Sequence, residues 1–367
     1  MKFTCERSVL LKEISIAQEI IASKNAISIL SNIYLEAVDD RLIIKATDMK
    51  VNFETKVPVT VLEPGSTTVF GDKFVGFLSS FPHEEVEFSQ EDINIVIKPT
   101  VQKKPRLGLK SIASDKFPEF PVSSAPFFDM PIKDFKEMVQ QTVFAVSDDE
   151  TRYFMNGVYL EKVEDKINMV ATDGRRLAYI SKPAGKEIQD FAGIIVPPKI
   201  LNTIVKRSGD EGLVSISITD KTIFINFASY KFSSVLLEGQ FPNYRKVIPE
   251  NQQFSLTVKR EEMLNALHRV SLMVEKKSHR VYMGINNGSM AVSSEEEEFG
   301  GNIDDEIPCQ YAGEEVSIAL NYRYIEEPLK VINADEISIR FTGATKAITI
   351  TPVPEKDFFH IVMPMQS

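Results

Sequence analysis

Cysteine and histidine are scarce in this chain of 367 residues, and neither is clustered. The two cysteines, Cys5 and Cys309, are far apart and lack the Cys-x-x-Cys spacing that is typical of zinc and redox sites. The four histidines are scattered at His83, His268, His279 and His360. We therefore expect no disulfide framework, no metal site and no cofactor.

Long apolar runs are also missing. The charged segment Met1–Arg7 is not followed by the apolar core of a signal peptide. No uninterrupted apolar stretch reaches the length that a membrane-spanning helix needs. We therefore expect a cytoplasmic protein.

An excess of basic residues is missing as well, because 42 lysines and arginines face 52 aspartates and glutamates, for a net charge of −10. Binding nucleic acid by overall electrostatics needs cations that displace the counterions of the phosphates. The composition argues against that mode of binding. It still allows a basic face on particular elements of an otherwise acidic protein.

What the chain does contain is a long internal repeat. Its length suggests two or three domains at roughly 100 to 200 residues each. Ala46-Thr47-Asp48 recurs as Ala171-Thr172-Asp173, with the aspartates 125 positions apart (173 − 48). Phe117-Pro118 recurs as Phe241-Pro242, 124 positions apart (241 − 117). Two independent landmarks thus indicate one domain-sized period.

Helical and alternating patterns follow the same period. Apolar residues at helical spacing predict three long helices and three short ones. The long helices are expected over Glu6–Ile21, Pro131–Val146 and Lys259–Val274, and the short ones over Lys73–Ser80, Pro198–Arg207 and Asn321–Val331. Alternating runs between them predict strands. We therefore expect an α+β protein of three tandem domains, 1–125, 126–250 and 251–367.

The segment Ala171–Ala178 follows one of these strands. Threonine and aspartate oxygens cap local backbone donors, and a glycine adopts positive φ easily, so Thr172-Asp173-Gly174 predicts a turn between two strands. Its simplest interpretation is purely structural. The first repeat shares Thr-Asp but continues as Met49–Asn52 where the second has Gly174–Leu177. The second repeat therefore departs from the common plan at this point.

Five segments carry a family resemblance. They are Met1–Thr4, Arg152–Gly157, Ala171–Ala178, Gly239–Arg245 and Val362–Met365. Together with the threefold repeat, they resemble the bacterial DNA sliding clamps, the beta subunits of the replicative polymerase, along the whole chain. No single segment is specific, but five in order make coincidence a poor explanation.

The resemblance implies both an architecture and an activity. Two three-domain subunits would join head to tail in a closed ring of six DNA-clamp domains, with helices on the inner face and antiparallel sheets outside. An ATP-driven clamp loader would place this homodimer around duplex DNA, where it would tether the replicative polymerase and other replication and repair proteins. The resemblance implies no catalysis.

The resemblance also implies a client-peptide pocket between the second and third domains. The expected apolar wall is Met155, Leu177, Pro242, Val247, Ile361, Val362 and Met363. The expected rim is Arg152, Thr172, Gly174, Arg175 and Arg176, and the remaining members are Lys246, Asn321, Tyr324, Thr345, Ala347, Pro364 and Met365. Methionines at the surface repack around different apolar side chains, which suits a site with many clients. The alternative is that a final apolar strand merely completes a sheet.

This chain departs from the family at the rim of that pocket. Arg175 stands where many members have histidine, Lys246 stands where many have arginine, and the chain ends in Gln366-Ser367. These differences change charge more than shape. We therefore expect the same class of peptide with altered preferences.

Two charged surfaces complete the prediction. The DNA-facing residues are expected to be Lys24, Lys73, Tyr153, Phe154, Lys199, Lys206 and Arg207. The dimer interface is expected to join the basic residues Lys103, Lys104 and Arg106 to the acidic residues Glu295, Glu296, Glu297 and Glu298. The resemblance implies that Leu107 packs near Leu272 and Met273 at the same interface. A few sequence-independent phosphate contacts permit sliding, and opposite charges favour head-to-tail association. The alternative is that these charges are ordinary solvated surface.

Two other classes of function compete with a clamp. For an enzyme, Asp48 and Asp173 would have to share a cleft, but repeat symmetry puts them in separate domains, and no nucleophile triad or phosphate-binding loop is present. A β-rich scaffold without a nucleic acid partner is the other alternative. Retention on circular DNA, followed by release when the circle is cut, would distinguish a clamp from a scaffold.

Overall fold

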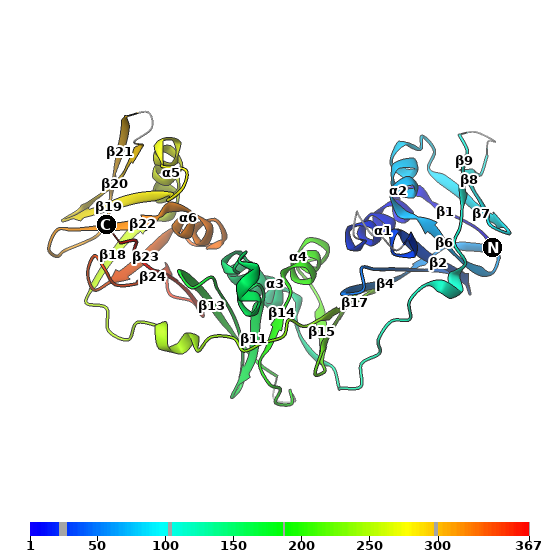
Figure 1. Ribbon diagram of the computed structural model, residues 1–367, viewed down its shortest axis with the longest axis horizontal. Helices are drawn as coiled ribbons and strands as arrows, with labels where there is room; N and C mark the ends of the chain where they lie inside the picture. The colour runs from blue at the N-terminus through cyan, green and yellow to red at the C-terminus, as the bar shows by residue number, and fades with distance from the viewer. Residues whose placement is uncertain (22–27, 102–104, 186–187, 297–299, 367) are drawn as a thin grey trace. The chain divides into compact units, whose positions relative to one another are not determined.

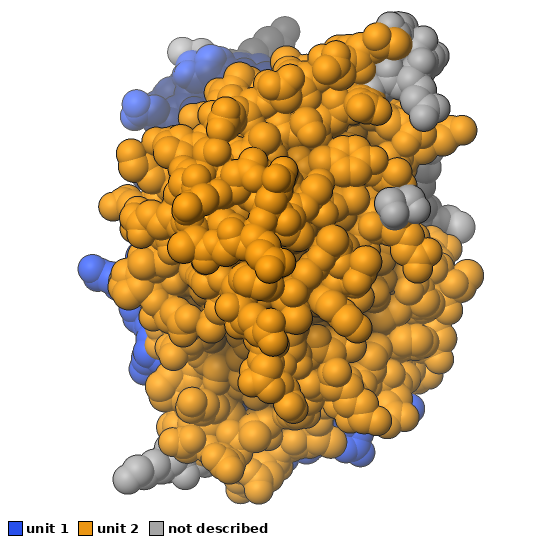
Figure 2. All heavy atoms as spheres, turned by 90° about the vertical axis from the view of Figure 1, so that its left-hand side faces the viewer, with its two compact units in different colours: residues 1–132, 208–236 blue, residues 133–207, 237–367 orange. Residues whose placement is uncertain are grey.

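The computed structural model describes residues 1–21, 28–101, 105–185, 188–296 and 300–366. The chain divides into two compact units. Unit 1 consists of Met1–Ile132 and Ser208–Leu236, and unit 2 consists of Lys133–Arg207 and Leu237–Ser367. Figure 2 colours unit 1 blue and unit 2 orange.

Unit 1 contains two antiparallel sheets. The five-stranded sheet has the order β5 (Thr60–Glu63), β1 (Lys2–Glu6), β7 (Glu85–Glu91), β8 (Asn94–Pro99), β9 (Leu107–Lys110). The eight-stranded sheet has the order β10 (Phe128–Pro131), β15 (Leu213–Ile218), β16 (Thr222–Phe227), β17 (Tyr230–Val235), β4 (Val51–Pro58), β3 (Arg41–Thr47), β2 (Asn32–Val38), β6 (Gly65–Phe70).

Unit 2 repeats this arrangement. Its eight-stranded sheet has the order β14 (Ile194–Val196), β11 (Val158–Val163), β12 (Lys166–Thr172), β13 (Arg176–Pro183), β25 (Phe358–Val362), β24 (Ile348–Val353), β23 (Glu336–Phe341), β18 (Phe254–Lys259). Its four-stranded sheet has the order β21 (Gly301–Pro308), β20 (Ser289–Glu296), β19 (Arg280–Asn286), β22 (Val316–Asn321).

Helices cover these sheets. The α-helices of the described residues are α1 (Arg7–Ile20), α2 (Gly71–Ser80), α3 (Ile132–Thr142), α4 (Pro198–Arg207), α5 (Arg260–Val270) and α6 (Tyr322–Val331). The 3-10 turns are η1 (Ser28–Ser31), η2 (Ser114–Lys116), η3 (Val143–Ala145), η4 (Glu150–Met155), η5 (Tyr244–Val247) and η6 (Ser271–Met273). In unit 1 the pair α1 and α2 lie side by side, as do α5 and α6 in unit 2 (Figure 1).

The amphipathic pattern explains how α1 packs. Leu10, Ile14 and Ala17 recur at helical spacing and are fully buried against the strands β3 and β4. Burying apolar area of this kind stabilises the fold by about 25 cal/mol per Å². The helix therefore anchors its repeat through one stripe of side chains.

The two eight-stranded sheets are each built from two repeats. The strand β17 of the second repeat pairs with β4 of the first, and β25 of the third pairs with β13 of the second. This sharing explains why the second repeat is divided between the two units. The prediction of an α+β fold built from three tandem repeats is confirmed, and the sheets run across the junctions between repeats.

Most expected elements are present, with changes at their ends. The predicted helices over Pro131–Val146 and Lys259–Val274 end earlier and continue as the 3-10 turns η3 and η6. The alternating run before the Glu164-Asp165 turn predicts a strand from Tyr153, but the strand β11 starts at Val158. The Asp149 carboxylate accepts a hydrogen bond from the Thr151 amide and holds Glu150–Met155 in η4. The strand β21 was not predicted, since its acidic sequence hides the alternation.

Several predicted residues lie outside the described part of the chain. These are Lys24, Lys103, Lys104, Glu297 and Glu298, together with the side chain of Glu296. Within the part that is described, no helix is long and apolar enough to cross a membrane.

Candidate functional site

The turn between β12 and β13 is built by its own side chains. The Asp173 carboxylate accepts hydrogen bonds from the amides of Arg175 and Arg176, at 2.8 and 3.0 Å. The Thr172 hydroxyl accepts from the Gly174 amide at 3.1 Å and donates to the Arg176 carbonyl at 2.6 Å. The Thr-Asp pair therefore closes the turn by side-chain capping, as the sequence predicts.

The first repeat forms the same turn with a different residue at the tip. Asp48 accepts from the amides of Lys50 and Val51, at 2.9 and 2.7 Å. Met49 has φ of 73°, and its equivalent Gly174 has φ of 87°. At Gly174 an added Cβ would lie 3.1 Å from the Arg152 guanidinium, so glycine also permits the arginine to approach closely.

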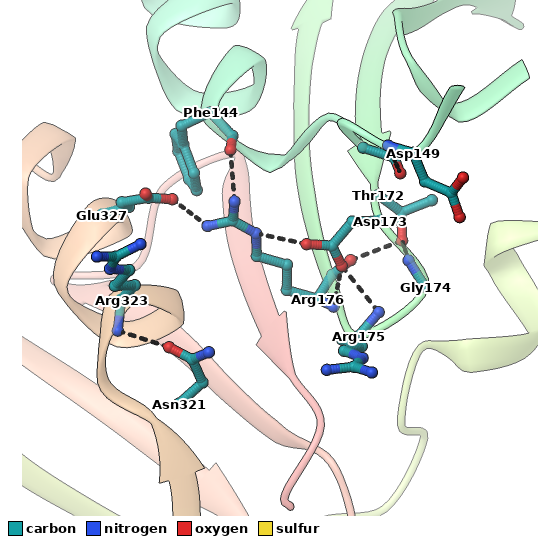
Figure 3. Close-up of polar contacts among 11 residues, drawn as sticks. Phe144, Asp149, Thr172, Asp173, Gly174, Arg175, Arg176, Asn321, Arg323 and Glu327 are labelled. Carbon is teal, nitrogen blue, oxygen red and sulfur yellow. Dashed lines mark hydrogen bonds and ion pairs between the residues drawn. The ribbon is translucent and has the colours of Figure 1, made fainter. Parts of the chain in front are cut away.

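Arg176 braces this turn from within unit 2 (Figure 3). Its guanidinium donates to the Asp173 carboxylate at 3.1 Å, to the Phe144 carbonyl at 2.7 Å and to the Glu327 carboxylate. The Tyr324 ring centre lies 4.6 Å away, within cation–π range. Only 11% of the Arg176 side chain is exposed. Arg176 therefore links β13 to η3 and α6.

Arg175 projects away from this network, and its side chain is exposed (Figure 3). Its carbonyl accepts a hydrogen bond from the Met363 amide at 2.8 Å. The Met365 amide donates to the Ala319 carbonyl, also at 2.8 Å. These two bonds hold the end of the chain between the turn and the strand β22.

A cavity of about 360 Å³ lies at this end of the chain. It is lined by Arg175, Asn321, Tyr324, Met363, Pro364, Met365 and Gln366. Six of these seven belong to the predicted pocket, and Gln366 is the addition. We call this space the C-terminal cavity. Asn321 is fixed there because its side chain caps α6 by accepting from the Arg323 amide at 3.0 Å.

The predicted apolar wall is divided between core and surface. Leu177 and Ile361 face each other across the β13–β25 ladder and belong to a buried hydrophobic cluster, with Ala347 packed against it. Met155 and Val362 are buried too. By contrast, 43% of Met363 and 52% of Val247 are exposed. These two side chains therefore offer apolar surface to a ligand.

The other predicted pocket residues do not line the C-terminal cavity. Thr172 is buried, Arg152 and Pro242 are half-buried, and Gly174, Lys246 and Thr345 are exposed. Their role in binding a client stays a prediction.

Sequence reasoning missed the partners that lie beneath the turn. Glu327 and the Phe144 carbonyl came from distant segments, so no local motif pointed to them. His360 is fully buried on β25 and its Nε2 lies 3.0 Å from the Gln141 amide oxygen. Burial, helped by the positive charge of Arg176, lowers the pKa of His360 to about 3. This histidine is therefore neutral and structural.

The expected DNA-facing residues lie mostly at the surface. Lys73, Tyr153, Lys199 and Lys206 are exposed, while Phe154 and Arg207 are half-buried. Two other cationic side chains on helices form hydrogen bonds within the protein. Arg7 donates to the Leu78 carbonyl at 3.2 Å, and Arg260 donates to the Leu329 carbonyl at 3.1 Å. These arginines cap the second helix of their repeats, so not every helix cation is available to phosphate.

The described interface residues lie near two sheet edges. Leu107 is the first residue of β9, the end strand of its sheet, and Arg106 directly precedes it. Glu295 lies at the end of β20, next to the edge strand β21. Leu272 is 72% exposed, an unusual state for a leucine.

Comparisons with known proteins agree on one family. The domain models of the DNA polymerase III beta subunit match residues 1–121 (N-terminal domain), 129–243 (central domain) and 245–366 (C-terminal domain). The chain is 46% identical to the beta sliding clamp of Treponema pallidum (strain Nichols) over 371 residues, with 100% of both chains covered.

Solved structures agree. The DnaN sliding clamp of Bartonella birtlesii, bound to griselimycin, is 25% identical with a TM-score of 0.94 and full coverage of both chains. The Bacillus subtilis DNA polymerase sliding clamp is 27% identical with a TM-score of 0.92, over 100% of this chain and 99% of that one. With its repeated fold and these full-length matches, the chain belongs to the DNA polymerase III beta subunit family, the bacterial sliding clamps, and functions as a sliding clamp.

Proposed function

We propose that two copies of this chain form a closed head-to-tail ring around duplex DNA. The ring holds DNA without sequence preference and tethers the replicative polymerase, so it acts as a processivity factor and not as an enzyme. Its other partners are the clamp loader and further replication and repair proteins, and it works in the cytoplasm, at the nucleoid. Each subunit contributes the domains 1–125, 126–250 and 251–367.

The edges of the sheets support the closure of the ring by two copies of the chain. Inside the chain, neighbouring repeats are joined by antiparallel strand pairs. β9 and β21 are end strands of their sheets. Two copies arranged head to tail bring β9 of one copy to β21 of the other, and the same contact repeats to close the ring. An edge strand that finds such a partner no longer exposes unpaired backbone groups.

The presence of the C-terminal cavity is the observation that best supports client binding. It combines an exposed methionine, the Arg175 rim and the last residues of the chain in one space. A short client segment can place an apolar side chain against Met363 while its polar groups meet Arg175 and Asn321. The predicted pocket residues that lie outside this cavity would extend the contact.

The ring is tested on DNA. Labelled protein is loaded on a nicked circle with the clamp loader and ATP, and the free protein is removed by gel filtration. The protein should stay with the circle and be released within minutes when one restriction cut linearises it. Equal retention on circular and linear DNA would refute encirclement.

The pocket is tested with a fluorescent peptide that carries the clamp-binding segment of the polymerase subunit. Met363→Ala should weaken binding about fivefold or more, because removing a contacting apolar side chain costs about 1 kcal/mol. Met49→Ala is the matched control, since Met49 is 58% exposed at the tip of the equivalent turn in unit 1. Fluorescence anisotropy gives both affinities. Unchanged binding by Met363→Ala would remove Met363 from the site.

Leu177→Ala should also weaken peptide binding, both through a lost contact and through a loss of stability. Leu177 is only 3% exposed, so its truncation leaves a cavity in the core at a cost of roughly 2–5 kcal/mol. Its thermal midpoint must therefore be measured beside its affinity.

A further inference from the structure

Glu161 is a buried carboxylate of unit 2 that belongs to none of the predicted sites. It lies on β11 and is only 7% exposed. Asn168, directly opposite on β12, donates a hydrogen bond from its side-chain amide to the Glu161 carboxylate at 3.3 Å. The Tyr179 hydroxyl in turn donates to the Asn168 amide oxygen at 3.1 Å. A buried charge is costly unless it is paired and hydrogen-bonded, so Glu161 needs further partners.

Those partners come from the segment that joins the second repeat to the third. The Tyr244 hydroxyl donates to the Glu161 carboxylate at 2.5 Å, and the Arg245 guanidinium donates to it at 2.5 Å as well. The Arg245 guanidinium also lies 4.7 Å from the centre of the Tyr244 ring, within cation–π range. Burial, together with the bond to Glu161, raises the pKa of Tyr244, so its hydroxyl stays protonated. Glu161 therefore ties this segment to the sheet.

The tied residues begin the 3-10 turn η5, which also carries Val247 of the predicted pocket. Tyr244 belongs to the buried hydrophobic cluster of Leu177 and Ile361, whereas 52% of Val247 is exposed. Val247 follows Tyr244 and Arg245 within one tight turn. Fixing these two residues therefore fixes where Val247 meets the surface.

The first repeat keeps the carboxylate in a different setting. Glu36 is the equivalent of Glu161, because 125 positions separate them (161 − 36), as they separate the two Thr-Asp turns. The residue opposite Glu36 is Ile43, at the position that corresponds to Asn168 (168 − 43 is also 125). The Glu36 carboxylate accepts a hydrogen bond from the Tyr34 hydroxyl at 3.2 Å. The contact through an asparagine is thus a feature of the second repeat.

The segment that follows the first repeat also differs at the two donors. Counted from the Phe-Pro pair of each repeat, Phe120 and Pro121 occupy the positions of Tyr244 and Arg245. Phenylalanine and proline side chains cannot donate a hydrogen bond. Among the residues that the structure describes, the tie is therefore built at the junction of the second and third repeats and not at that of the first and second.

We propose that Glu161 is a positioning residue of the client-peptide pocket, which holds Val247 in place through Tyr244 and Arg245 before a client binds. The proposal rests on the pocket proposed above and adds a buried residue to it. A side chain that is already in place loses less conformational freedom when a ligand binds. The tie therefore raises the affinity for a client that Glu161 itself does not touch.

A double-mutant cycle of peptide binding tests this role. Glu161→Gln removes the charge that holds the two donors and should weaken binding of the fluorescent polymerase peptide about fivefold. Val247→Ala removes the side chain that is positioned, so adding Glu161→Gln to Val247→Ala should cost at most about twofold more. Met363 lies outside η5, so adding Glu161→Gln to Met363→Ala should still cost about fivefold.

The pattern separates positioning from a general loss of stability. A destabilised chain loses apparent affinity by the same factor in every background, because only its competent fraction binds. Equal losses with Val247→Ala and with Met363→Ala would therefore overturn the positioning role. Unchanged binding by Glu161→Gln would overturn it as well.

Glu36→Gln is the matched control, because Glu36 holds the equivalent position in the first repeat and accepts its hydrogen bond from Tyr34. It should leave the peptide affinity unchanged. Tyr244→Phe is the second variant, since it keeps the ring and removes only the hydroxyl. It should weaken binding about threefold and show the same coupling to Val247→Ala. Binding as tight as that of the parent chain would overturn the tie through Tyr244 and the proposal with it.

Amide hydrogen exchange in the free chain gives a measurement that needs no client. The Ile248 amide donates to the Arg245 carbonyl at 3.4 Å across η5. Its exchange should accelerate about threefold or more in Glu161→Gln, since the turn opens more often once its first two residues are released. An unchanged exchange rate would overturn the positioning role.

The same measurements distinguish failure of the pocket from failure of the positioning role. If Met363→Ala and Val247→Ala both bind the peptide as the parent chain does, the pocket lies elsewhere and the role of Glu161 falls with it. If these two variants bind more weakly and Glu161→Gln does not, the pocket stands and only the role of Glu161 is overturned.

Discussion

At the scale of single residues, some side chains of the site stabilise the fold, while others stay exposed and can contact a ligand. Arg176 and Arg175 are neighbours in sequence, yet one is bonded to three separate segments and the other is exposed. Their difference follows from their positions, because Arg176 is the first residue of β13 while Arg175 lies in the turn before that strand. The two arginines of the sequence motif thus have different functions.

Replacing Arg176 should destabilise unit 2. Arg176→Lys keeps the charge but loses the planar fork that reaches Asp173, Phe144 and Glu327 at once, at a cost of about 1–3 kcal/mol. Differential scanning calorimetry should show a lower melting temperature. Arg175→Lys is the control and should stay within about 0.5 kcal/mol of the parent chain. An equally stable Arg176→Lys would mean that the network contributes little.

His360 makes a prediction about pH. Its folded pKa of about 3 lies below the ordinary value of 6.5, so between these values the unfolded chain binds the proton and the folded chain does not. The stability from neutral His360 is complete above pH 6.5 and is lost as the pH falls toward 3, at up to about 1.4 kcal/mol per pH unit. His360→Asn should flatten the fall in melting temperature between pH 6 and 4.

His268 provides the comparison for that experiment, because it is an exposed histidine on α5. His268→Asn should leave the pH profile as in the parent chain. If both variants, or neither, change the profile, the acid sensitivity belongs to other groups.

At the scale of elements, two helices of a repeat are held together by one arginine. Arg260, the first residue of α5, donates to the carbonyls of Leu329 and Ala334, which lie at and just beyond the end of α6. Helix ends leave carbonyls without partners, and a guanidinium satisfies two of them at once. In the first repeat the Arg7 guanidinium donates to one such carbonyl, that of Leu78 near the end of α2.

Removing this cap should loosen α6. Arg260→Met keeps the apolar stem but leaves two carbonyls unsatisfied, at an expected cost of about 1–2 kcal/mol. Amide hydrogen exchange should accelerate in the last turn of α6. Lys259→Met, at the neighbouring exposed position, should leave that exchange rate unchanged. Equal rates in the two variants would contradict the capping role.

At the scale of the whole molecule, net charge and ring topology affect DNA binding in separate ways. A chain with a charge of −10 has little overall attraction for DNA, so weak contacts from a few helix cations allow sliding. Retention on DNA then depends on the ring being closed. The protein can therefore bind DNA weakly by direct contact and still be retained strongly on DNA that its ring encloses.

Salt separates the two effects. Protein already loaded on a circle should remain there when NaCl is raised to 0.5 M, because topological retention needs no counterion release. Binding to linear DNA without a loader should be weak at low salt and vanish at the same concentration. Gel filtration with labelled DNA measures both. Loss of the loaded protein at a salt concentration where the dimer itself persists would mean that charge, and not closure, holds the DNA.

The sequence by itself was enough to predict the threefold repeat, the helices and the Thr-Asp turn, because hydrophobic period and turn chemistry are local properties. The ends of α4 were predicted to the residue, and both copies of the turn have the same capping bonds. The six predicted residues that line the C-terminal cavity came from family resemblance, and local pattern did not point to them.

Only the tertiary structure decided which strands pair across repeats, which arginines form hydrogen bonds that stabilise the fold, and which strands lie unpaired at the edges of their sheets. A strand pattern tells that a strand exists but does not identify its neighbour, since any edge offers the same backbone groups. Phe144, Glu327 and Arg176 meet only after three distant segments pack together. The physical reason is that pairing and burial depend on contacts between segments far apart in the sequence, whereas helices and turns form from neighbours.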